Sequence, residues 1–233
     1  MKPTMTSLVV AEWRKVTTTK MLWVLSLVAI LYSCIQVVTL VLVSAGLLAG
    51  LPDQGDLLLD PDYITALLAQ TGTAATFVLI LGIIAMTGEF RHMTITSTFL
   101  AAPRRSRVLA AKMLLYGALG AGIALVTMGF VVAVASASML PFEHAPITAS
   151  AVARVLVGAV IGLCLYAVLG VSIGSVITNQ VAAIVTALLW VLLVQALVGL
   201  AFPDVNRWLP GGALSSAMDV GLRTDATGGM TPA

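Results

Sequence analysis

The chain has 233 residues, of which 60% are hydrophobic and only 9% are charged, and its mean hydropathy is +1.07. Soluble domains carry about 25% charged residues, so the composition excludes a water-soluble globular protein and predicts an all-α integral membrane protein. The formal net charge of +2 gives no indication of a nucleic-acid partner.

The chain begins with a short amphipathic segment. Within SLVVAEWRKV, a helix places Leu8, Val9 and Trp13 toward lipid and turns Glu12, Arg14 and Lys15 toward lipid headgroups. We therefore expect an interfacial helix over residues 4–19, lying flat before the first membrane span. The alternative is a frayed, basic cytoplasmic tail. A cleaved secretory signal is disfavoured because the following apolar run, residues 21–50, is too long.

Five apolar runs are long enough to cross a bilayer, which takes about 20 residues of helix. Asp60 and Pro61 suit the N-cap and first position of the second helix. The predicted spans are residues 21–50, 61–87, 113–140, 155–177 and 180–202.

Basic residues are distributed unevenly between the connections. Nine precede the first span or lie between the second and third, whereas three lie on the other side: Lys2, Arg14, Lys15, Lys20, Arg91, Arg104, Arg105, Arg107 and Lys112 against Arg154, Arg207 and Arg223. The positive-inside rule then places the N-terminus in the cytoplasm. Five spans would leave residues 203–233 outside, as an external segment leading to a sixth helix that this sequence lacks.

The connection at residues 88–107, GEFRHMTITSTFLAAPRRSR, is basic and amphipathic. Phe90 and Met93 fall at near-helical spacing with Ser97 and Leu100, and Ile95 and Phe99 lie beside them. Arg91 and His92 lie toward the polar side. Pro103 would end the helix before Arg104 and Arg105. This segment is either a docking helix for a cytoplasmic partner or an ordinary positive loop on anionic lipid.

Small and polar residues inside the spans indicate how the helices pack, but they do not point to one function. The pairs Gly158/Gly162 and Gly170/Gly174 allow close helix packing, in a tight bundle or a dimer. Gln36 and Gln195 are expected to bond to neighbouring helices or, less often, to contact a substrate. Cys34 and Cys164 have no metal-site spacing and are expected to act as small buried hydrophobes.

The middle of every predicted span lacks Asp, Glu, Lys, Arg and His. Proton-driven carriers keep such residues where they act, so this mechanism is disfavoured. Intramembrane hydrolysis is disfavoured too, because His92 and His144 lie outside the spans. The phosphate-binding pattern G-x-x-x-x-G-K-[ST] is absent. Uphill transport would therefore need energy from another chain.

The segments AEWRKVTTTK and TGEFRHMTITSTFLAAPRRSRVLAAK, with the layout of nearly the whole chain, resemble the permease subunits of bacterial type-2 ATP-binding-cassette (ABC) transporters, in particular actinobacterial exporters. The resemblance implies an elbow helix, six spans, a coupling helix between the second and third spans, a paired permease and two ATPase subunits. ATP and Mg would bind the partner ATPase, and this chain would not be an enzyme.

The resemblance also implies roles for individual residues. Those expected to dock the ATPase are Glu89, Phe90, Arg91, His92, Met93, Phe99, Arg104 and Arg105. A lateral substrate path along the first, second and fifth spans would involve Gln36 and Gln195, and the apolar spans suit a lipophilic or amphipathic substrate. The alternative function is a non-transporting membrane scaffold, regulator or immunity protein.

Overall fold

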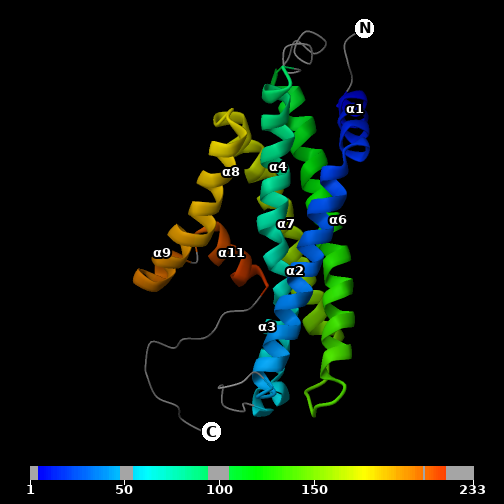
Figure 1. The fold of residues 1–233 in the computed structure, drawn as a ribbon, viewed down its shortest axis with the longest axis vertical. Coiled ribbons are helices and arrows are strands. Elements are labelled where there is room, and N and C mark those ends of the chain that lie inside the picture. The colour runs from blue at the N-terminus through cyan, green and yellow to red at the C-terminus, as the bar shows by residue number, and fades with distance from the viewer. Residues whose placement is uncertain (1–4, 48–54, 94–104, 207, 219–233) are drawn as a thin grey trace.

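A computed structural model describes residues 5–47, 55–93, 105–206 and 208–218. All elements in these ranges are helices, and five stretches are long and apolar enough to cross a membrane, as the sequence predicts. Figure 1 shows an elongated bundle with α1, the last turns of α4 and the first turns of α6 at the same end. The helical elements, in chain order, are α1 (Met5–Thr18), α2 (Lys20–Ser44), η1 (Gly55–Leu59), α3 (Pro61–Leu68), η2 (Ala69–Thr73), α4 (Ala74–Arg91), α6 (Arg105–Met139), α7 (Ala149–Val176), α8 (Gln180–Leu188), η3 (Leu189–Val194), α9 (Gln195–Ala201), α10 (Pro203–Asn206) and α11 (Pro210–Ala217).

The second span begins as predicted, and its α-helix is interrupted after the 8 residues of α3. Asp60 caps α3 by accepting a hydrogen bond from the Asp62 amide at 2.9 Å, and Pro61 occupies the first turn. The 3-10 stretch η2 then separates α3 from α4. The hydroxyls of Thr71 and Thr73 donate to carbonyls three residues earlier, at 2.8 and 2.7 Å, which satisfies groups that a 3-10 turn leaves poorly bonded.

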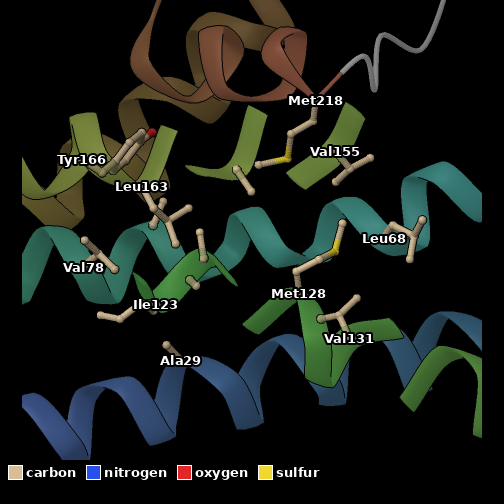
Figure 2. Close-up of a cluster of buried hydrophobic side chains, with 14 of the residues drawn as sticks. Ala29, Leu68, Val78, Ile123, Met128, Val131, Val155, Leu163, Tyr166 and Met218 are labelled. Atoms are coloured by element: carbon tan, nitrogen blue, oxygen red, sulfur yellow. The ribbon is translucent and has the colours of Figure 1, made fainter. Parts of the chain in front are cut away.

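Four long helices, α2, α4, α6 and α7, form the core of the bundle. Ala29, Val78, Met128 and Leu163 contribute to one continuous buried cluster. Figure 2 shows these side chains meeting between the helices, with Met218 entering from α11. Small side chains such as Ala29 allow the helix axes to approach, and the longer ones fill the remaining space.

Close approach between α4 and α7 depends on glycine. A Cβ on Gly170 would lie 2.2 Å from the Leu79 carbonyl oxygen, and one on Gly82 would lie 2.5 Å from the Ala167 carbonyl oxygen. Gly174 likewise faces Ile83 of α4, at 2.9 Å from its carbonyl oxygen. Any larger residue would have to push the two backbones apart.

The other glycine pair in α7 receives the short helix α11. A Cβ on Gly158 would lie 2.3 Å from the Ala217 carbonyl oxygen, and one on Gly162 would lie 1.9 Å from the Leu214 side chain. Both glycine pairs thus contact other parts of the same chain. Part of the predicted external segment therefore packs back onto the bundle.

The fifth span diverges from the other four. It consists of α8, the π-helical turn η3 and α9, and Figure 1 shows α9 pointing away from the bundle with α11 between it and α7. Many of its large apolar side chains are exposed, including Leu192, Leu197 and Leu200. Such a surface suits lipid or another apolar partner.

Candidate functional site

Four charged side chains from three helices meet at the end of the bundle where α1 lies. Glu12 and Lys15 come from α1, Glu89 from the last turn of α4, and Lys112 from the early part of α6. We call Glu12, Lys15, Glu89 and Lys112 the charge cluster. The cluster joins segments that are up to 100 residues apart in the sequence.

Each ammonium group contacts both carboxylates. Lys112 Nζ lies 2.6 Å from Glu12 Oε2 and 3.2 Å from Glu89 Oε1. Lys15 Nζ lies 2.7 Å from Glu12 Oε1 and 2.8 Å from Glu89 Oε1. Lys112 also donates to the Ala85 carbonyl oxygen at 3.3 Å and lies 5.8 Å from the centre of the Tyr116 ring. The two positive and two negative charges balance.

Most of the charge cluster is shielded from solvent. Lys112 is 2% exposed, Glu12 4% and Glu89 7%, whereas Lys15 is half-exposed. Moving an isolated ion into a protein interior costs several kcal/mol, about as much as a well-formed partner returns. The cluster therefore holds three helices in one arrangement, and separating any member from its partners would be costly.

The ion pairs of the charge cluster shift the pKa of Glu12 and the pKa of Lys15. Burial of Glu12 acts to raise its pKa, but the adjacent Lys112 and Lys15 together outweigh burial and lower it. Burial of Lys15 acts to lower its pKa, but hydrogen bonds to Glu12 and Glu89 outweigh burial and raise it. Both groups are thus held in their charged forms.

Local sequence explains how α1 reaches the cluster. Glu12 and Val16, four residues apart, form the buried face of α1, and Trp13 and Arg14 face outward. Thr19 is extended, with φ −93° and ψ 125°, and separates α1 from α2. The helix can therefore pack against α6 instead of following α2 without a break.

Two expectations for this region are corrected. Glu12 does not face outward with Arg14 and Lys15, because its carboxylate is directed to Lys112. The third span does not begin at residue 113: α6 already begins at Arg105, so Lys112 lies two turns inside a helix.

A pocket of about 370 Å³ adjoins the charge cluster. Its wall combines the charged groups with apolar side chains of α2 and α4, such as Leu22, Leu81 and Ile84. The four charged groups of the cluster pair with one another, and these ion pairs link α1, α4 and α6.

The residues predicted to dock a partner lie partly within the helix of the second span. The helix α4 continues through Glu89 and Phe90 to Arg91, beyond the predicted end at residue 87. Arg91 is exposed and donates to Gln180 Oε1 at 3.3 Å, which links α4 to the start of α8. His92 is exposed as well, and Met93 is 82% exposed with a φ of 55°.

The predicted positions Phe99 and Arg104 lie outside the described residues. Arg105 is the first residue of α6. Docking of a partner at these positions remains a prediction.

The two candidate glutamines lie in different environments. Gln195, at the start of α9, is 8% exposed, and a Cβ on Gly211 of α11 would lie 2.8 Å from its Oε1 atom. The Gln195 Nε2 atom is buried and has no hydrogen-bond partner among the described residues. Gln36, on α2, is half-buried. The structure thus places Gln195 at a junction between helices.

Lys112 is the member of the charge cluster that the sequence did not single out as a site residue. The available signal was a lone lysine in AAKMLL, directly before a long apolar run. The charge pattern predicts Lys112 in the connection between the second and third spans. In the structure, Lys112 lies inside α6 and contacts the carboxylates of Glu12 and Glu89.

Comparisons with known proteins give no match: no family model, no curated protein and no solved structure matches the chain. Within the described residues, no group of three or more His, Cys, Asp or Glu side chains is placed to hold a metal ion. Cys34 and Cys164 are free and half-buried.

Proposed function

We propose that the chain is the membrane-spanning permease subunit of an ABC exporter, driven by ATP hydrolysis on a separate ATPase subunit. The proposal starts from the resemblance of residues 88–112 to coupling segments of such permeases. The structural observation that supports it is the charge cluster, which ties α1 to both helices that flank residues 94–104.

The charge cluster is suited to transmitting a movement from one helix of the bundle to the others. A push on the segment between α4 and α6 would act on Glu89 at one side and Lys112 at the other. Because both are bound to α1 through Glu12 and Lys15, the three helices would move together. In this proposal, Glu89 transmits the movement from inside the bundle, and the exposed Arg91, His92 and Met93 are the surface that meets the ATPase.

The proposed location is the bacterial cytoplasmic membrane, with the N-terminus inside. Basic residues of α1 and the beginning of α6 lie at one end of the bundle, and Asp60, Asp62 and Glu143 belong to the other connections. A cysteine replacing Leu140 should react with an impermeant reagent on whole cells, and one replacing Met93 should not. The reverse result would overturn this orientation.

The proposal includes a second permease subunit, identical or related, and a lipophilic or amphipathic substrate. The exposed apolar face of the fifth span is compatible with a paired subunit.

The test is purification of the tagged chain in mild detergent from its native host, with quantification of accompanying proteins. An ATP-binding subunit in equal amount supports the proposal. Its absence, also after crosslinking, would favour the scaffold, regulator or immunity function. A matched pair of variants adds specificity. Replacing Arg91 and His92 by glutamate should reduce the recovered ATPase, and replacing Glu143, in the connection between α6 and α7, by lysine should not.

A further inference from the structure

A second pocket, separate from the charge cluster, lies where the fourth and fifth spans diverge. It measures about 270 Å³ and is bordered by four parts of the chain: α4, α7, the segment from α8 into η3, and the start of α11. Its lining residues are Leu79, Tyr166, Leu169, Ile173, Ile177, Thr186, Ala187, Trp190, Val191 and Pro210. We call it the fifth-span pocket.

Two irregular elements form part of its wall. Trp190 and Val191 belong to the π-helical turn η3, and π-helical turns inside α-helices occur frequently at functional sites. Pro210 is the first residue of α11, and a Cβ on the next residue, Gly211, would lie 2.8 Å from Gln195 Oε1. Gln195 therefore packs closely against the start of α11, next to the pocket but outside its lining.

The chemistry of the lining restricts the ligand. None of the lining residues carries a charge, and Tyr166 and Thr186 supply hydroxyl groups. Burying an unpaired charge in such surroundings is costly, so the ligand must be uncharged. Tyr166, which is 4% exposed, supplies one aromatic wall, and Trp190 supplies another.

The volume indicates the size of the ligand. A cavity of about 150 Å³ lined by apolar side chains binds benzene, and ligand sites are mostly apolar with a few polar groups. A pocket of about 270 Å³ therefore has room for a unit of about two fused rings.

We infer that the fifth-span pocket binds an uncharged, lipophilic molecule with a planar ring system of about that size. This inference rests on the proposed function, since it names the class of substrate such a permease would take up from the bilayer. In this inference, residues of α7, η3 and α11 contact the ligand, and Tyr166 and Trp190 provide the aromatic contacts.

The probe for the test is 1-nitronaphthalene, an uncharged two-ring compound that quenches tryptophan emission. The protein is prepared in nanodiscs with Trp190 as the sole tryptophan, after Trp13, Trp23 and Trp208 are replaced by phenylalanine. A second protein retains only Trp23, which is exposed on α2 and does not line the pocket. That protein reports how far the probe simply dissolves in the lipid.

We expect saturable quenching of Trp190 and only linear, unsaturated quenching of Trp23. In the Trp190 protein, Thr186→Tyr should weaken the saturable binding about tenfold or more by filling the pocket. The matched change Val185→Tyr, at an exposed position outside the lining, should leave it unchanged.

Linear quenching of Trp190 with the same slope as Trp23 would overturn the inference. Saturable binding that Thr186→Tyr does not weaken would overturn it too. The measurement uses this chain alone, so a failure to bind the probe is distinguishable from a failure to recruit an ATPase.

Discussion

Replacing Lys112 by methionine removes the most buried charge of the cluster and keeps most of the side-chain volume. The cluster then has two carboxylates and one ammonium, and that ammonium, on Lys15, is half-exposed. Removing one partner of a buried ion pair costs about 3–5 kcal/mol. Because Lys112 contacts both carboxylates and the Ala85 carbonyl oxygen, we expect the free energy of unfolding to fall by an amount in that range.

The assay is reversible unfolding of the purified protein by titration with sodium dodecyl sulfate. Lys20→Met is the matched control, because Lys20 is exposed at the start of α2, and its effect should stay within about 0.5 kcal/mol. The double variant Lys112→Met/Glu12→Gln should recover most of the loss, since it leaves the Lys15–Glu89 pair at 2.8 Å with balanced charge. Equal stability of the Lys112 and Lys20 variants would refute the reasoning.

Two further predictions concern helix packing and pH. Gly170→Ala should destabilise the protein by about 1–3 kcal/mol because its Cβ would meet the Leu79 carbonyl oxygen, whereas Gly122→Ala, with nothing within 4 Å, should be neutral or stabilising in the same unfolding titration. Stability should be highest between the ordinary pKa values of glutamate, 4.5, and lysine, 10.5. The lowered pKa of Glu12 stabilises the fold above 4.5, and this contribution is lost as the pH falls through the lowered value. The raised pKa of Lys15 stabilises the fold below 10.5, and this contribution is lost as the pH rises through the raised value. Glu12→Gln should flatten the acid side of a stability profile measured against pH; an unchanged acid side would contradict this assignment.

The long apolar runs were sufficient to predict the helical class and five spans, because a bilayer demands about 20 apolar residues for each crossing. The helix boundaries were less predictable. Hydropathy excludes Arg105 and Arg107, yet the backbone of α6 is helical through both. In η2, the hydroxyls of Thr71 and Thr73 bond to nearby carbonyl groups. Hydropathy does not register η2 or the π-helical turn η3.

The candidate site was predictable only in part. The sequence selected Glu12 and Lys15 as headgroup-facing residues of an elbow helix and Glu89 as a residue that docks the ATPase. Their partnership depends on the packing of α1 against α6 and on the register that brings Lys112 opposite both carboxylates. Neither feature is encoded in a local pattern, because charge pairing between distant helices appears only when the bundle is assembled.

The central claim, that the end of the bundle bearing α1 docks an ATPase, is tested most directly by site-directed crosslinking. Cysteine replaces either Met93 or Leu140, which are 82% and 80% exposed in different connections, in a protein whose Cys34 and Cys164 are changed to alanine. In native membranes, a bifunctional thiol reagent should link the Met93→Cys protein, but not the Leu140→Cys protein, to an ATP-binding subunit. Crosslinks to such a subunit from neither position, or from Leu140→Cys alone, would contradict the account.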